Sequence, residues 1–295
     1  MSSRSYAGIL YALAAATALG AITTQAKIVY LHGGNAMTVM LIRFVVTVLV
    51  TGLVVFGRRF WRRGHAVSQV QSKQWGLILI VGIAWSAGMI CYLMSVQSIS
   101  VSIAALIFYT YPLMVLGVSV VAGHVRFSAV YGALFVSAFI GLGLALLNGE
   151  IELAFHGILL ALMAAIGATV TFFIGAKVAS QTDPLTLTFM VSVIGLVLIL
   201  PFIQGHFVSP DTTGWLALGG ATVCYVIGIL SQFAALSRLA PATAAFVLNF
   251  EPVVSIVLAA GFLGELLTWR QWLGVSIVML TLLVSTRVRT AGNKN

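Results

Sequence analysis

Residues 8–16 read GILYALAAA and residues 157–165 read GILLALMAA, so seven of the nine positions are identical. A near copy of this length in mid-chain indicates a duplicated unit. The first copy follows Arg4 and leads into small residues near Ala26, a pattern that is also typical of a secretory signal peptide. Because the second copy lies far from the N-terminus, and because each copy opens one unit, we predict that residues 6–30 form a retained membrane helix.

A second block of similarity closes each unit. SIAALIFYTYP at residues 102–112 aligns with ATAAFVLNFEP at 242–252, and Pro112 falls on Pro252. In the apolar stretches that precede these blocks, three more pairs align at the same offset: Trp85 with Tyr225, Gly88 with Gly228, and Tyr92 with Gln232. Two blocks in the same order, with aligned prolines, favour a duplication over chance similarity between apolar helices.

The composition excludes a soluble globular protein. Of the 295 residues, 61% are hydrophobic and 7% are charged, and the mean hydropathy is +1.11. A soluble domain carries about 25% charged residues, whereas a membrane-crossing helix needs about 20 mostly apolar residues. Backbone groups in lipid must be hydrogen-bonded internally, which favours helices. We predict an all-α integral membrane protein with ten transmembrane helices, at residues 6–30, 36–57, 75–97, 101–122, 128–147, 156–177, 185–203, 213–236, 241–262 and 270–287.

The positive charges lie mostly on one side of these helices. With the N-terminus inside, 12 of the 15 Lys and Arg residues fall in cytoplasmic segments, and only Lys27 and Arg270 fall in segments on the opposite side. Four of the six acidic residues also fall on that opposite side. This bias follows the positive-inside rule and predicts that both termini are cytoplasmic. It also accounts for the net charge of +9 without nucleic acid as a partner.

Each unit holds five predicted helices, the first at residues 1–150 and the second at 151–295. Because five is an odd number, the second unit enters the membrane with the opposite orientation to the first. Inverted repeats of this kind are typical of secondary transporters, whose substrate sites lie near the middle of the membrane between the repeats. We therefore predict two inverted-topology five-helix repeats and a secondary transporter that works by alternating access around a central cavity.

Seven side chains from the two units are candidates for contact with a substrate: Trp85, Met89, Tyr92, Tyr109, Tyr225, Gln232 and Asn249. The first three share one face of a helix at i, i+4 and i+7 spacing, and the others come from the aligned blocks. Aromatic and amide groups that converge from both units would form an amphipathic pocket for a small zwitterion or aromatic solute. The alternative is that the aromatic residues serve in packing or in belts at the membrane surface.

Two formally charged residues lie well within the predicted membrane helices. At 1.5 Å per residue, Arg43 lies about 12 Å from one surface and Glu251 about 15 Å from the other, near the middle of a core about 30 Å thick. Charges at this depth are costly and are expected to face the protein interior with a partner. We predict an intramembrane charge pair between them, either as a gate or proton-sensitive switch or as a static lock between two helices.

Pro112 and Pro252 interrupt equivalent helices of the two units. Proline removes one backbone hydrogen bond and kinks a helix. Each proline therefore marks either a hinge for the rocking of the repeats or a static kink, which membrane helices tolerate. The equivalence of the two positions favours a hinge or gating role.

The proline motifs resemble those of a known family. Five-helix duplicates with YTYP at 109–112 and NFEP at 249–252 resemble the ten-helix EamA-type branch of the drug/metabolite transporter superfamily. GELLTWRQWLGVSIV at 264–278 is similar to the closing segment of that family, and LIRF at 41–44 is similar to its second-helix arginine. The first unit departs from the pattern, with His124 where the family usually has glutamate.

Within this family, the length and apolar character resemble the bacterial amino-acid exporters, including the exporter of aromatic amino acids. The resemblance implies a multi-pass protein of the bacterial cytoplasmic (inner) membrane. It also implies export of small metabolites, most of all aromatic and neutral amino acids. A multidrug exporter or an exporter of other metabolites such as nucleosides is the alternative within the superfamily.

Other classes of membrane protein have less support in the sequence. A channel is the nearest alternative, because a receptor or sensor would usually add a sizeable soluble domain. An intramembrane enzyme needs paired carboxylates or a His-rich metal motif, and we expect no catalytic residues. No P-loop motif and no metal-ligand spacing occur, so we predict no cofactor and no metal. The expected partners are a small-molecule substrate and membrane lipid, and the chain is expected to be a monomer or a homodimer.

Overall fold

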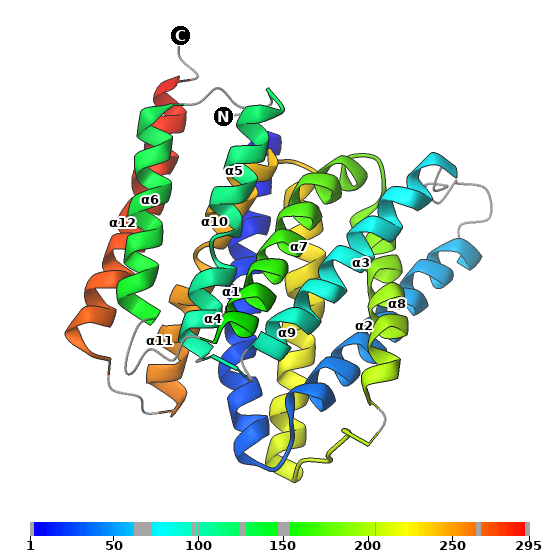
Figure 1. Ribbon diagram of the computed structural model, residues 1–295. Helices are drawn as coiled ribbons and strands as arrows, with labels where there is room; N and C mark the ends of the chain where they lie inside the picture. The colour runs from blue at the N-terminus through cyan, green and yellow to red at the C-terminus, as the bar shows by residue number, and fades with distance from the viewer. Residues whose placement is uncertain are drawn as a thin grey trace.

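The computed structural model describes residues 3–61, 72–95, 98–99, 101–123, 128–146, 154–203, 205–263 and 267–292. Within these ranges the chain forms one bundle of helices (Figure 1). The first repeat holds α1 (Ser3–Leu31), α2 (Ala36–Trp61), α3 (Ser72–Ser95), α4 (Val101–Phe108), α5 (Tyr111–Val121) and α6 (Ala129–Leu146). The second holds α7 (Phe155–Ala179), α8 (Pro184–Ile203), α9 (Thr212–Leu236), α10 (Pro241–Leu248), α11 (Glu251–Leu263) and α12 (Trp269–Gly292).

The ten predicted helices are confirmed, and two of them are broken. The fourth is divided into α4 and α5, and the ninth into α10 and α11. Within the described ranges, eight of the ten crossings are long and apolar enough to span a membrane by length and composition. The apolar part of α6 is shorter, and α6 packs against α12. His124 and the Gly264–Glu265 motif lie outside the described residues.

The helix packing follows the duplication. α1 packs along α9, and α7 packs along α3, which are equivalent pairs when the repeats are exchanged. The first pair is antiparallel, because Gly8 lies against Leu239 at one end and Gly34 against Pro210 at the other. The second pair is antiparallel too, because Gly157 lies against Ile99, while at the far end Gln74 Nε2 donates to Oε1 of residue Gln181 at 2.9 Å.

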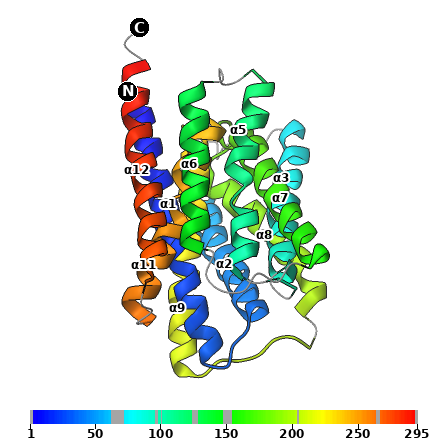
Figure 2. The ribbon, with the colours of Figure 1, turned by 60° about the vertical axis from the view of Figure 1, so that its left-hand side comes forward.

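The second repeat is inverted relative to the first. In the view of Figure 1, α1 runs downward and α2 runs upward, whereas their counterparts α7 and α8 run upward and downward. The two ends of the chain lie at the same end of the bundle (Figures 1 and 2). We refer to this as the terminal end; its assignment to the cytoplasm stays a prediction.

Glycine brings the paired helices into close contact. A β-carbon at Gly167 on α7 would lie 2.5 Å from the carbonyl oxygen of Ala84 on α3. Gly141 on α6 and Gly274 on α12 each face the carbonyl oxygen of the other. Small residues let membrane helices approach closely and gain van der Waals contact, because lipid gives no hydrophobic driving force between helices.

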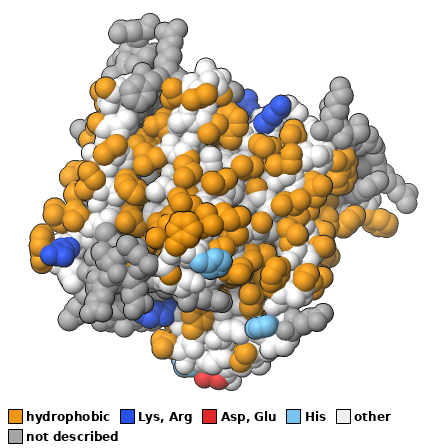
Figure 3. Space-filling view, viewed as in Figure 1, with side chains coloured by type: hydrophobic (Ala, Val, Ile, Leu, Met, Phe, Trp, Pro, Cys, Tyr) orange, Lys and Arg blue, Asp and Glu red, His pale blue; other side chains and the backbone are white. Residues whose placement is uncertain are grey.

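The outer surface is apolar. Hydrophobic side chains are spread over the face shown in Figure 3, and the few charged side chains lie toward its margins. Large apolar residues are exposed on several helices, among them Leu53 at 76% and Leu216 at 75%. This surface suits contact with lipid rather than with water.

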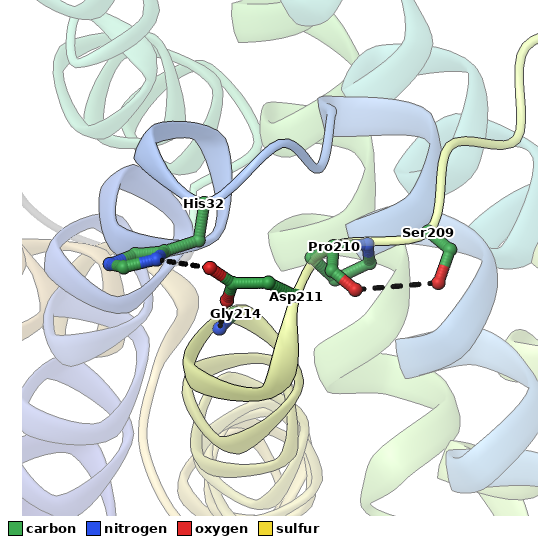
Figure 4. A network of polar contacts seen from close by, with 5 residues as sticks. All are labelled: His32, Ser209, Pro210, Asp211 and Gly214. Carbon is green, nitrogen blue, oxygen red and sulfur yellow. Dashed lines mark hydrogen bonds and ion pairs between the residues drawn. The ribbon is translucent and has the colours of Figure 1, made fainter.

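A polar network ties two connections together at the end of the bundle opposite the terminal end (Figure 4). His32 Nδ1 lies 2.8 Å from Asp211 Oδ2, and the Asp211 amide donates to the His32 carbonyl. The other carboxylate oxygen of Asp211 accepts from the Gly214 amide at 2.9 Å and caps α9. The Gly214 amide and the His32 side chain hold the pKa of the Asp211 carboxyl below its ordinary value.

Candidate functional site

The breaks in the fourth and ninth crossings are equivalent. α4 ends at Phe108 and α5 begins at Tyr111, while α10 ends at Leu248 and α11 begins at Glu251. Each proline is the second residue of the helix that follows its break, where a missing N–H removes no intrahelical hydrogen bond. The predicted interruptions are therefore present, as two-residue turns just before the prolines rather than kinks at them. Their role as hinges stays a prediction.

The two breaks border a cavity in the middle of the bundle. Its volume is about 190 Å³, and helices of both repeats line it. Six of the seven predicted substrate contacts lie on its wall: Trp85, Met89, Tyr92, Tyr109, Tyr225 and Gln232. Asn249 is buried at 3% exposure and is not on the wall. Contact of these residues with a substrate stays a prediction.

Two repeat-equivalent residues meet at this wall. Trp85 Nε1 donates a hydrogen bond to Tyr225 Oη at 3.2 Å, and these residues occupy aligned positions on α3 and α9. Phe44 on α2 packs edge-on against the Tyr225 ring, with ring centroids 5.9 Å apart. The cavity therefore lies where the two repeats face each other, which is where inverted-repeat transporters place their substrate.

Arg43 and Glu251 both line the cavity, but no ion pair joins them in the described part of the chain. The Arg43 guanidinium lies over the Tyr225 ring, 4.7 Å from its centroid. Glu251 lies beside Tyr109 on the cavity wall. The two residues come from different walls, α2 and α11, and each lies against aromatic residues. The predicted charge pair, as a gate, a switch or a static lock, stays a prediction.

Several polar groups at or beside the cavity have no hydrogen-bond partner. Arg43 Nε, both amide atoms of Gln232 and Asn249 Oδ1 are buried without one. Buried polar atoms in native proteins are almost always paired with protein or water. Because these atoms are buried, they would reach water or the polar groups of a substrate only after a shift of their side chains.

Other residues of the wall escaped the sequence analysis. Tyr111 lines the cavity and stacks on Phe172 of α7, with centroids 5.0 Å apart. A signal for Tyr111 was available, since it aligns with Glu251 in the YTYP and NFEP motifs. Tyr30 and Phe172 carry no such signal, because both come from long apolar helices, and tertiary packing alone brings them to the cavity.

The cavity extends toward the end of the bundle that carries His32 and Asp211. Its α1 wall begins at Leu19 and continues to Tyr30, which is 44% exposed. On the terminal side of Leu19, Ala12 and Ala16 of the same helix are completely buried in the core. On α1, the cavity therefore does not continue past Leu19 toward the terminal end.

A metal site has no support in the described ranges, where no group of three or more His, Cys, Asp or Glu side chains is placed to hold an ion. The chemistry of the cavity is that of aromatic rings, hydroxyls, amides and two separated charges. Such groups bind and orient a solute.

Comparison with known proteins identifies the family. Residues 6–147 and 155–287 each match the EamA-like transporter family. The chain belongs to that family. The two matches correspond to the two repeats, and the first match includes α1 from residue 6 onward. EamA-like proteins are membrane transporters of the drug/metabolite superfamily, so the chain is a multi-pass transporter.

The fold of this EamA-like chain also occurs in a solved crystal structure, described only as "Crystal structure of protein". The two are 15% identical, with a TM-score of 0.79 over 95% of this chain and 96% of the other. This likeness shows the shared fold and does not identify a substrate. Among curated proteins, none matches the sequence.

Proposed function

We propose that the protein exports small metabolites, most of all aromatic and neutral amino acids, across the bacterial cytoplasmic membrane by alternating access. The observation that carries the proposal is the cavity between the two inverted repeats, with the equivalent residues Trp85 and Tyr225 in contact at its wall. A site built from both repeats becomes accessible from the other side of the membrane when the repeats exchange conformations.

The cavity supports a small solute. Its volume of about 190 Å³ is below the range of about 300–1,000 Å³ that is usual for drug-sized ligands. The aromatic wall and the two separated charges suit a solute with an apolar part and charged ends. These features favour an amino acid over a bulky drug as the substrate.

The extent of the cavity supports an alternating mechanism. If the terminal end faces the cytoplasm, as the positive-inside rule predicts, the structure represents an outward-facing state. Rocking of one repeat against the other would then open the terminal end and close the opposite end. The turns before Pro112 and Pro252 are the proposed hinges, because each separates two rigid helices that line or border the cavity.

Counterflow in proteoliposomes tests this function. Vesicles are loaded with unlabelled solute, and entry of labelled amino acids, nucleosides and cationic drugs is measured. We expect saturable counterflow of amino acids, which Leu53→Ala on the exposed surface of α2 leaves unchanged. Entry of nucleosides or drugs alone would reject the amino-acid assignment, and conductance without counterflow would identify a channel.

A further inference from the structure

Arg43 places a guanidinium on the wall of the cavity without an acidic partner. It lies over two aromatic rings, 4.7 Å from the Tyr225 centroid and 5.4 Å from that of Phe44, and its Nε has no hydrogen-bond partner. Of the acidic residues that the structure describes, Asp183 and Asp211 accept from amides at the starts of α8 and α9. Glu251 lies beside Tyr109.

An unpaired cation at this depth needs a reason. Charges inside a membrane protein are costly, and those that remain usually pair or mark the path of a substrate. The two aromatic faces offset part of the cost of burying Arg43. The two rings are nearly perpendicular to each other, with an angle of 84° between their planes, so they contact the guanidinium from two directions. Arg43 contributes to the cavity wall, and a guanidinium has five N–H donors.

We propose that Arg43 is the anion-binding group of the cavity and takes the carboxylate of the substrate. This inference rests on the proposed transport of small solutes through the cavity. A guanidinium presents parallel N–H donors that match the two oxygens of a carboxylate. Tyr30, an electrostatic neighbour of Arg43 that also lines the cavity, supplies a hydroxyl for the same anion.

The opposite charge has its own place in the cavity. Glu251 lies on another wall, and its carbonyl packs against Gly20 of α1. Leu19, the neighbour of Gly20 in the sequence, packs against Gly228 of α9. Gly228 lies one helical turn from Tyr225, whose ring contacts Arg43. The two charges therefore lie at similar depths, with aromatic residues around them. A zwitterion fits with its carboxylate at Arg43 and its ammonium group toward Glu251.

Paired ligands that differ only in the carboxylate test this inference. L-phenylalanine and L-phenylalaninamide share the ammonium group and the ring, and binding of each to the full chain in detergent is measured by ligand-dependent thermal stabilisation. We expect wild-type protein to bind phenylalanine at least tenfold more tightly than the amide. Arg43→Gln should reduce this preference to less than twofold, and Arg43→Lys should retain part of it.

Arg58→Gln is the matched control, because Arg58 is an exposed residue of the same helix outside the cavity wall. It should keep the full preference. Absence of a preference in wild-type protein, or a tenfold preference in Arg43→Gln, overturns the inference. Failure of Arg43→Gln to fold without ligand would also overturn the inference, because it would show that Arg43 is a structural lock.

Counterflow is measured separately from binding. Loss of counterflow for every solute rejects the transport function, whereas intact counterflow with no carboxylate preference rejects only this role of Arg43.

Discussion

The two repeats pack their helices alike and line the cavity differently. At three aligned positions the first repeat has tyrosine and the second has an amide or a carboxylate: Tyr92 with Gln232, Tyr111 with Glu251, and Tyr109 with Asn249. All six side chains line the cavity except Asn249, which lies beside it. Packing against lipid and between helices tolerates symmetry, because it depends on small and apolar residues. A small solute is itself asymmetric, and the cavity proposed to bind it lacks the symmetry of the fold.

The charge of Arg43 shows the same divergence. Asn35 and Asp183 play equivalent roles at the starts of α2 and α8, where their side chains accept from the amides of Thr38 and Thr186. Arg43 follows Asn35 by eight residues, and the fully buried Val191 follows Asp183 by eight residues. The helix register was kept after duplication, while the cation occurs in the first repeat alone at this position.

The largest effect is expected where the shared packing is broken. Gly167→Leu places a side chain against the Ala84 backbone, which cannot move without separating α7 from α3. We expect loss of folded protein, with a destabilisation of roughly 3 kcal/mol or more, measured as the loss of a monodisperse peak in size-exclusion chromatography. Gly219→Leu is the control, because nothing lies near a β-carbon there. Equal behaviour of the two variants would contradict the close approach.

The next effect separates the two repeats at one equivalent position. Glu251→Gln should lower counterflow about 100-fold, equivalent to about 2.7 kcal/mol, because it removes the carboxylate of the cavity. Tyr111→Phe at the aligned position should lower counterflow less than about threefold, since it removes only a hydroxyl. Similar losses in both variants would show that the repeats contribute alike.

The same Glu251→Gln variant tests the proton-sensitive switch. If Glu251 is that switch, wild-type counterflow depends on pH and the variant loses this dependence. A variant that keeps the wild-type pH profile would remove the switch and leave Glu251 as a binding or structural group.

A smaller effect is expected where the repeats meet. Trp85→Phe and Tyr225→Phe each remove the hydrogen bond between the two residues, at a cost of about 0.5–1.5 kcal/mol in stability. Because both substitutions remove the same bond, the double variant should cost less than the sum of the two. Thermal unfolding in detergent measures all three, and simple additivity would show that the contact contributes nothing.

The smallest effect concerns the polar links between equivalent helix pairs. Asp211→Asn should slightly lower the melting temperature near neutral pH. The pKa of Asp211 is lowered in the folded protein, so its charge stabilises the fold above the ordinary pKa of about 4. That contribution is lost as the pH falls through the lower folded value.

The difference between wild type and Asp211→Asn should therefore shrink in acid. Gln74→Leu breaks the link between α3 and the end of α7, where Gln74 donates to Gln181. Because the hydrogen bond between Gln74 and Gln181 joins two amides that do not titrate in this range, the loss of that bond should not depend on pH. A constant effect of Asp211→Asn between pH 7 and pH 3 would exclude the charge as its origin.

The sequence was sufficient for the helices, the duplication and the two breaks, because apolar length and proline are local signals. The depth and the pairing of Arg43 and Glu251 stay predictions, because position along a helix gives height in the membrane and not direction across the bundle. Asn249 fell beside the cavity rather than on its wall although it aligns with Tyr109, which lines the cavity, because the alignment of the repeats does not fix which of two equivalent side chains faces the cavity.

The contact between Trp85 and Tyr225 has a consequence for the transport cycle. If the repeats exchange conformations as proposed, the operation that exchanges them maps this contact onto itself, so the contact would lie on the axis of the motion. Residues far from the axis would contact different residues when the cavity opens to the other side of the membrane. Trp85 and Tyr225 would stay in contact with each other. A solute resting against this pair would stay in place while the membrane opening moves around it.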